Sequence, residues 1–377
     1  MIGSEGNDVM KTENSKRLLS LDALRGFDML FIMGLSAVIT SLCNAFGLGG
    51  GCWLARQMRH VQWHGFAQHD TIFPLFLFIA GVAFPFSYAK MREKGWTTAR
   101  ISAKLVYRGL ILVLLGMIYN GLFNKGFGEV RWASVLGRIG LGWMFAAFLY
   151  MAFSYRTRIA VAIGLLAGYW AIMRFVSVPG APAGADPWSP EWNLAAYVDR
   201  LLLPNPLGKG ADPEGLLSTI PAVVTAMLGM FTGEFVRTKD GTGLRKTIAM
   251  FVVAAAMLVA GLAWANWMPI NKKLWTSTFV LVAGAYSIAL FAAFYWIVDV
   301  KMWRVWTFPL RVVGMNAITI YMLQRIVDFK SVTKFFLGGL TNVVPDAFGP
   351  VVMATGYLVL CWLVLWFLYR KGTFLKV

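Results

Sequence analysis

The chain has 377 residues, of which 58% are hydrophobic and 14% are charged, and its formal net charge is +17. Soluble domains carry about 25% charged residues, so this composition excludes an ordinary soluble globular protein and indicates an integral membrane protein. The basic residues gather in alternate loops between apolar segments. That pattern orients membrane proteins, and it argues against nucleic-acid binding as the reason for the positive charge.

The first apolar segment covers about residues 24–42, close to the roughly 20 residues that cross a bilayer. Residues 1–19 are polar and basic and lack an apolar stretch with a small-residue cleavage site, so we predict a cytoplasmic tail rather than a cleaved signal peptide. Arg25 and Asp28 lie three positions apart and share a helical face. They fit an interfacial ion pair, or an arginine that awaits an anionic ligand at the cytoplasmic surface.

All three histidines of the chain lie just before the second span, at His60, His64 and His69, and Asp70 follows directly. We predict a short helix over residues 52–69, in which His60 and His64 share one face. Three interpretations stay open. His60, His64 and Asp70 suit a zinc site; histidines also suit a membrane interface; and one imidazole, with Asp70 orienting a ring, suits general base catalysis.

The second span is predicted over residues 72–88, and eight more follow. They cover about residues 105–123, 132–153, 159–178, 216–236, 247–268, 276–298, 309–327 and 351–369. We therefore predict an all-α polytopic membrane protein with about ten transmembrane helices, a single domain over residues 20–377 and both termini in the cytoplasm. Arg108 and Arg311 lie near cytoplasmic ends, whereas Arg138 lies about two turns inside its span, where a charge needs a partner or a wet cavity.

Polar residues also gather in the loops that this topology places outside. Residues 179–215 form the longest polar segment, and its tryptophans and acids, including Asp212 and Glu214, suit a sugar or amine ligand or an ordinary solvated loop. Lys272 and Lys273 lie on another outer turn, as contacts for an anion or as snorkelling anchors.

The chain has three cysteines, Cys43, Cys52 and Cys361, and no CxxC pair of the kind that binds metals. Cys43 and Cys52 are predicted near the same membrane face. One disulfide and two buried thiols are both compatible with this spacing.

Several sequence fragments occur along the chain in a characteristic order and spacing. They are RLLSLDALRGFDM at residues 17–29, HxxWxGxxxxDxxFPxFxFxxG at 60–81, WASVLGRIGLGW at 132–143, AAYVDRLLL at 195–203, DPEGLLSTI at 212–220, PINKKLWTSTFV at 269–280 and GMNAITIYM at 314–322. Through them the chain resembles the heparan-α-glucosaminide N-acetyltransferase family, including its bacterial transmembrane homologues, over nearly all of residues 17–377.

The resemblance implies a membrane acyltransferase. Such an enzyme takes acetyl from cytoplasmic acetyl-CoA and passes it to the amine of a glucosamine-type sugar on the opposite side. The resemblance also implies a bacterial inner-membrane location, a homodimer and no resident metal. The family's active-site histidine falls on His60 and its aspartate on Asp70, while the position of His64 is Asn in the animal enzyme. Ser36 stands where the animal enzyme has Asn near the outer end of the first span.

The residues fit this chemistry, because a glucosaminium must lose a proton before its nitrogen attacks a thioester, and a neutral imidazole can take that proton. We predict catalysis by His60 with Asp70 and His64. For acetyl-CoA we predict contacts from Arg25, Arg108, Arg311, Arg138 and Ser36, with Arg138 either supporting the thioester or pairing with Glu214. For the acceptor we predict contacts from Trp63, Glu214, Asp212, Lys272 and Lys273.

Alternatives remain at three points. Acetyl moves directly to the amine, or through an acetyl-histidine. In place of an enzyme, a proton-coupled transporter or flippase for a glycan or an acyl carrier would use the histidines as a relay. A metal-dependent hydrolase of the outer leaflet is the third class.

Overall fold

The computed structural model describes residues 18–205 and 212–375, and within these ranges the chain forms helices joined by turns, with no strand. In these residues, nine helices are long and apolar enough to cross a membrane, which confirms the predicted all-α polytopic class. Their bounds are Leu19–Ala45 (α2 to α3), Ile72–Glu93 (α5), Thr98–Tyr119 (α6), Val135–Ala152 (α8), Tyr155–Phe175 (α9), Thr219–Arg237 (α11), Gly243–Trp264 (α12), Ser277–Val300 (α13 and its last turns) and Asp346–Arg370 (which contains α17). Most of the predicted tail lies outside the described residues.

The ninth predicted span, residues 309–327, is not a continuous helix. It forms α14, Phe308–Gly314, and α15, Ala317–Ile326, with a break at Met315 and Asn316. The buried side chain of Asn316 donates a hydrogen bond to the carbonyl of Thr373 (3.1 Å) and accepts one from the hydroxyl of Thr319 (3.3 Å). These two bonds satisfy the buried side-chain amide, and at the break itself the backbone N–H groups of Met315 and Asn316 donate to the carbonyls of Arg311 and Val313 (3.0 Å each).

The starts of several helices follow from capping residues in the sequence. A serine or threonine hydroxyl accepts a backbone N–H from the first turn of α6, α8, α9, α12 and α13, and the caps are Thr97, Ser134, Ser154, Thr242 and Thr276. Each cap satisfies an N–H group that the helix itself leaves without a partner.

The helices α5 and α11 are in backbone contact along the centre of the molecule. At Gly229 and Gly233 of α11, an added Cβ would overlap the carbonyl groups of Phe78 and Val82 in α5. The four-residue spacing of the two glycines puts both on one face of α11, so the helices approach as closely as small-residue interfaces in membranes allow.

The first span bends where α2, Leu19–Leu30, passes through a wide turn, Phe31–Leu35, into α3, Ser36–Ala45. Gly34 within that turn has a φ of 124°, a conformation that favours glycine. The bend sets the direction of α3 and of Ser36 at its start.

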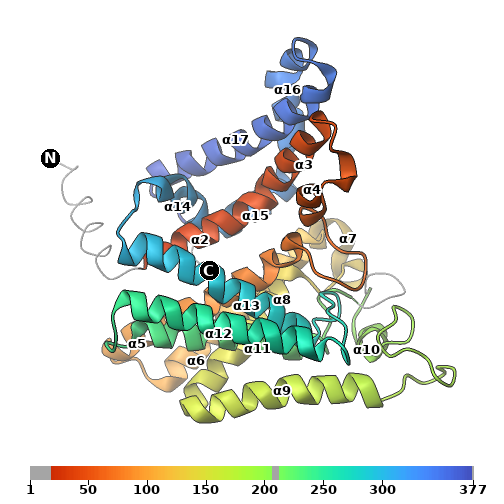
Figure 1. Ribbon diagram of the computed structural model, residues 1–377, viewed down its shortest axis with the longest axis vertical. Helices are drawn as coiled ribbons and strands as arrows, with labels where there is room; N and C mark the ends of the chain where they lie inside the picture. The colour runs from red at the N-terminus through yellow and green to blue at the C-terminus, as the bar shows by residue number, and fades with distance from the viewer. Residues whose placement is uncertain (1–17, 206–211, 376–377) are drawn as a thin grey trace.

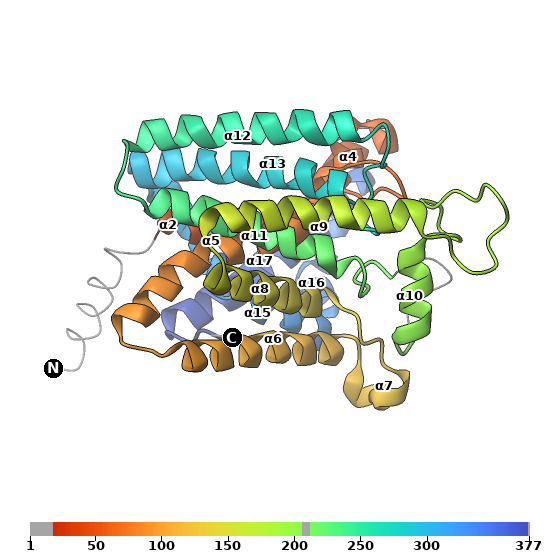
Figure 2. The ribbon, with the colours of Figure 1, turned by 90° about the horizontal axis from the view of Figure 1, so that it is seen from below.

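The two ends of the long helices differ in the segments that cover them. The short helices α4 (Trp53–Gln57), α7 (Leu122–Glu129) and α10 (Leu194–Leu202) gather at one end, which we call the His60 end (Figure 2). The loops that join α5 to α6, α8 to α9 and α11 to α12 lie at the other, which we call the basic end. In Figure 1, α17, α14, α15 and the α2–α3 helix lie on one side of the packed α5, α11, α12 and α13.

Candidate active site

The His60 side chain is oriented by a buried carboxylate. His60 Nδ1 lies 2.7 Å from Oδ1 of Asp70, whose side chain is 1% exposed while that of His60 is 55% exposed. Oδ2 of Asp70 accepts a hydrogen bond from the backbone N–H of Val61 (3.3 Å). Asp70 closes a single helical turn, Gln68–Asp70, directly before α5 begins at Ile72, so the start of a long helix fixes its position. The imidazole is thus held at one nitrogen and open to solvent elsewhere.

The ammonium of Lys272 joins this pair from a distant part of the sequence. Its Nζ lies 3.4 Å from Oδ1 of Asp70 and 3.1 Å from Nδ1 of His60. Lys272 sits on the turn before α13. There the side chain of Asn271 accepts the N–H of Leu274 (3.0 Å). The N–H of Gly65 donates to the carbonyl of Ile270 (2.9 Å), so the histidine loop and the lysine turn are tied by backbone as well.

The charge of Asp70 determines which nitrogen of His60 carries a proton. Burial raises the pKa of Asp70, but the hydrogen bond from His60 and the charge of Lys272 outweigh it and hold that pKa below its usual value. An ionised carboxylate only accepts hydrogen bonds, so the Nδ1 atom of His60 carries the hydrogen. Nε2 is then the nitrogen with the lone pair, which is the arrangement a general base needs.

His69 lies beside the pair and is held from the first span. Its ring centroid is 4.5 Å from that of His60, and its Nδ1 lies 3.1 Å from the hydroxyl of Ser36 at the start of α3. Burial, followed by the charges of His60 and Lys272, lowers the pKa of His69 to about 4. His69 is therefore neutral at physiological pH and acts there as a hydrogen-bonding group.

The predicted helix over residues 52–69 is wrong. Only Trp53–Gln57 is helical, and the chain then runs irregularly to the turn at Gln68. Gly65 has a φ of 124°, which a helix does not allow. His60 and His64 consequently share no helix face: His64 Nδ1 lies 3.3 Å from the side-chain nitrogen of Asn271. Burial lowers the pKa of His64.

The aromatic and basic candidates next to His64 form a separate contact. The indole N–H of Trp63 donates to the carbonyl of Trp188 in the long loop (2.7 Å). Nζ of Lys273 lies 5.5 Å from the centre of the Trp63 ring. Trp63 thus joins the histidine loop to the segment predicted outside, and Lys272 and Lys273 serve different neighbours.

The two acids of the long loop face a guanidinium. Arg131 forms ion pairs with Asp212 and Glu214, and its Nε donates to Oδ2 of Asp212 at 2.8 Å. Asp212 is fully buried. Arg131 was not among the predicted residues, although an arginine predicted at the same membrane face as an acidic loop is a signal of such a pair.

Arg138 hydrogen-bonds to the residues before α11 and packs against the lysine turn. Its Nη2 donates to the carbonyl of Gly215 (2.9 Å) and to the hydroxyl of Ser218. Its guanidinium carbon lies 5.0 Å from the ring centre of Trp275, a buried residue of the turn. The side chain is 2% exposed, and its Nε and Nη1 have no hydrogen-bond partner.

A second group of cations lies at the basic end, about 30 Å along α5 from Asp70 at 1.5 Å per residue. There a pocket of about 260 Å³ carries no carboxylate among its lining residues. Its lining residues include two tryptophans and four cations, namely Trp96, Trp143, Lys90, Lys94, Lys104 and Arg108. The guanidinium of Arg108 lies 4.6 Å from the Trp143 ring centre, and its Nε is buried without a partner. Such a pocket suits an anion with a flat ring.

The other predicted arginines lie outside this pocket. Arg25 lies 3.6 Å from Asp22, and its charge is close enough to act on Arg108. Arg311 lies in α14, where its Nε is buried without a partner. The residues predicted to contact acetyl-CoA thus lie in two places. Arg25 and Arg108 act on each other at the basic end, whereas Ser36 and Arg138 belong to the surroundings of His60.

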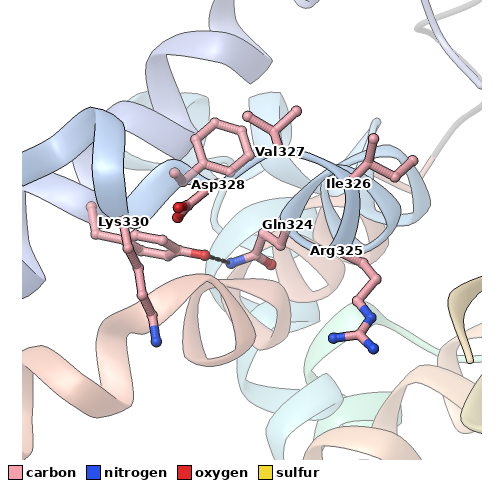
Figure 3. A pocket seen from close by; sticks show the side chains of 8 residues that line it. Gln324, Arg325, Ile326, Val327, Asp328 and Lys330 are labelled. Atoms are coloured by element: carbon pink, nitrogen blue, oxygen red, sulfur yellow. Dashed lines mark hydrogen bonds between the residues drawn. The ribbon is translucent and has the colours of Figure 1, made fainter. Parts of the chain in front are cut away.

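A further pocket of about 270 Å³ lies where α15 passes into α16, Phe329–Leu337 (Figure 3). The amide of Gln324 donates to the hydroxyl of Tyr357 (2.8 Å), and the side chains of Arg325 and Lys330 extend on either side of this bond. None of the residues predicted for catalysis or binding lines this pocket. Among the described residues, no three His, Cys, Asp or Glu side chains form a group that could hold a metal ion.

Comparison with known proteins bears out the resemblance. No protein-family model matches the chain. It is 27% identical over 368 residues to heparan-alpha-glucosaminide N-acetyltransferase of Homo sapiens, covering 83% of this chain and 53% of that protein. The Mus musculus protein of the same name is 27% identical over 373 residues, covering 84% and 55%.

The likeness to the heparan-alpha-glucosaminide N-acetyltransferases is confirmed. It covers more than four fifths of the chain, whereas the chain spans about half the length of the curated relatives it matches. The class of reaction therefore has support at the level of these relatives, and the roles of single residues depend on the geometry described above.

Proposed function

We propose that the protein is a membrane acetyltransferase that moves acetyl from acetyl-CoA to the amine of a glucosamine-type sugar. The observation that carries this proposal is the His60–Asp70 pair, in which a buried carboxylate orients a half-exposed imidazole. The names of the two relatives supply the class of reaction. The pair supplies the base that acetylation of an amine requires.

In the proposed reaction the amine nitrogen attacks the thioester carbonyl carbon, and Nε2 of His60 accepts a proton from the amine. The new C–N bond forms, the C–S bond breaks, and the thiolate of CoA leaves and takes up a proton. Asp70 stabilises the imidazolium that forms, because its Oδ1 atom is 2.7 Å from Nδ1. Lys272, 3.4 Å from the same oxygen, keeps that carboxylate ionised.

The basic pocket suits the nucleotide end of acetyl-CoA, which is the end opposite the acetyl group. Its four cations fit the phosphates of CoA, and its two indole rings fit a flat base. Arg108 is the predicted arginine that lines this pocket, and Arg25 acts on it from outside. Arg311 stays a prediction for the donor as well.

Two buried oxygen atoms suit contact with the arm of acetyl-CoA, which joins its nucleotide to its thioester. Oδ2 of Asp28 and Oε1 of Gln68 are buried without hydrogen-bond partners. Buried polar atoms without partners are rare in native structures, and the arm of CoA carries amide N–H and C=O groups that would satisfy them. We propose that the arm passes Asp28 and reaches the acetyl position beside Ser36 and His69.

For the acceptor we propose binding at the exposed edge of His60. Trp63 offers an aromatic face and Lys273 a cation beside it. Asp212 and Glu214 are already paired with Arg131, so their proposed part is to shape the loop that borders the site.

We propose that the basic end faces the cytoplasm, following the rule that cytoplasmic loops are enriched in lysine and arginine. The His60 end then faces outward, and both chain termini lie in the cytoplasm. The basic side chains that support this orientation are Lys90, Arg92, Lys94, Arg100, Arg156, Arg237, Lys239, Lys301, Arg304, Arg370 and Lys371. Location in a bacterial inner membrane and assembly as a homodimer stay predictions.

The test is acetyl transfer by purified His60→Ala, with Gln62→Ala in the same exposed loop as the matched control. Transfer from labelled acetyl-CoA to glucosamine should fall by about 10²–10⁴-fold in His60→Ala and by less than about threefold in the control. Stabilisation by acetyl-CoA in a thermal melt shows that each variant is folded and still binds the donor. Turnover of His60→Ala near that of the unchanged protein would contradict the proposal.

A further inference from the structure

Two cysteines meet at the His60 end of the molecule. Sγ of Cys43, in the last turn of α3, lies 3.5 Å from Sγ of Cys52, the residue that precedes α4. Cys43 is 6% exposed. The third cysteine, Cys361, lies fully buried in α17 and belongs to another packed cluster.

The loop between the two cysteines brings them together. Gly47 and Gly49 have φ values of 71° and 56°, which let the chain turn back within a few residues. A disulfide has an S–S distance of about 2.05 Å, so the two sulfur atoms need to move about 1.5 Å closer. A change of side-chain rotamer moves a sulfur by that amount without moving the helices.

The surroundings of Cys52 favour its thiolate. A backbone N–H of Ala55 in the first turn of α4, followed by the side chain of Cys43, lowers the pKa of the Cys52 thiol. The thiolate is the form that attacks a disulfide in thiol–disulfide exchange. Cys52 is thus the attacking sulfur and Cys43 the resolving one.

We propose that Cys43 and Cys52 are joined by a disulfide that braces the histidine loop. The thiolate of Cys52 attacks a disulfide of an extracytoplasmic oxidoreductase and forms a mixed disulfide. Cys43 then displaces the oxidoreductase, so the pair loses two protons and two electrons and the oxidoreductase leaves as a dithiol. The step rests on the proposed orientation, which exposes the His60 end to an oxidising compartment.

The bridge would close a ring of contacts around the candidate base. Ser36 in α3 holds His69, and the side-chain oxygen of Gln57 in α4 accepts the N–H of Gln68 at 2.9 Å. These contacts join both helices to the turn that ends in Asp70. A covalent bond between Cys43 and Cys52 fixes α4 against α3 and so restrains the turn from both sides.

The test counts thiols in protein purified from membranes that are treated with N-ethylmaleimide during lysis. Peptide mapping and labelling with a maleimide polymer after denaturation should detect Cys361 alone as an originally free thiol. Reduction should then release two further thiols. A Cys361→Ala variant is the control and should have no originally free thiol, with the same two released. Three originally free thiols in the unchanged protein would overturn the proposal.

The bracing role has its own readout. Reduction of the unchanged protein, or the double substitution Cys43→Ser and Cys52→Ser, should lower the Tm by about 3–6 °C. It should also speed amide hydrogen exchange in residues 52–70. Unchanged exchange there after the two thiols are released would overturn the brace. Acetyl transfer measured on the same samples keeps this result separate from the proposed function, because the thiol count does not depend on turnover.

Discussion

The sharpest prediction concerns Asp70→Asn, which keeps the shape of the side chain and removes its charge. Oδ2 of Asp70 accepts the N–H of Val61 (3.3 Å), and Oδ1 accepts the Nδ1–H of His60 (2.7 Å). An asparagine has one acceptor oxygen for these two donors and for the ammonium of Lys272, which lies 3.4 Å from Oδ1. If that oxygen takes the N–H of Val61, the amide NH₂ faces His60 and the ring must carry its proton at Nε2. The nitrogen that faces the substrate then has no lone pair.

The size of the loss follows from the bond that is removed. A hydrogen bond to a charged group contributes about 1.5–3 kcal/mol, which is about 10–150-fold in rate if it acts on the imidazolium of the transition state. The wrong tautomer adds to this, so we expect kcat for acetyl transfer to fall by about 10²–10⁴-fold. KM for acetyl-CoA should stay within about threefold, because the donor pocket lies at the other end of α5.

The assay is transfer of labelled acetyl to glucosamine between pH 6 and pH 9, with Asp240→Asn as control. Asp240 is an exposed residue of the loop between α11 and α12, and the same chemical change there should leave kcat unaltered. The loss in Asp70→Asn should persist at every pH, because it comes from a fixed tautomer and not from a shifted titration. A kcat within about threefold of the unchanged protein would refute the role assigned to the pair.

Three further predictions concern charged groups near His60 and in the basic pocket. Lys272→Gln removes a cation that lowers the pKa of Asp70, so acid denaturation followed by Tm should begin at a higher pH; an identical pH curve would contradict this. His69 has its pKa lowered from 6.5 to about 4, so the unfolded state binds the extra proton and stability should fall as pH drops from 6.5 to 4. Solvent screening reduces this loss of stability to about 1.5 kcal/mol. His69→Asn should make stability less dependent on pH in this range, and a pH dependence equal to that of the unchanged protein would contradict the reasoning. Arg108→Gln should raise KM for acetyl-CoA about tenfold, and the exposed Arg156→Gln should not; equal KM values would argue against the donor pocket.

The fold could be predicted from hydropathy and loop charge because a bilayer demands long apolar helices. The same rule failed at residues 309–327, where the run is apolar but contains Gly314 and Asn316. A window average counts apolar side chains and does not register a local turn such as the one at Met315 and Asn316. The side chain of Asn316 at this break contacts the carbonyl of Thr373, 57 positions along the chain, and no local pattern contains such a contact.

The candidate site was predictable only in part. Asp70 was expected to orient one of the histidine rings, and in the structure it contacts His60, ten positions away. Lys272 is 212 positions from His60, so its place beside the pair follows from the packing of two loops. A helix over residues 52–69 would have put His60 and His64 on one face, but Gly65 adopts a φ of 124° that interrupts any such helix. Packing against the 270–276 turn then determined the local path.

The close contact of α5 and α11 restricts how the two ends of the proposed active site communicate. Gly229 and Gly233 bring the two backbones together, so no passage for a donor runs between these helices. The first span offers the other flank of α5. Arg25 near its start acts on Arg108 in the basic pocket, Asp28 one turn later has a buried oxygen without a partner, and Ser36 at the start of α3 contacts His69. Polar groups therefore follow the first span from the cations to the histidines, and along this flank the arm of a donor whose phosphates bind at the basic end would carry its acetyl group towards His60.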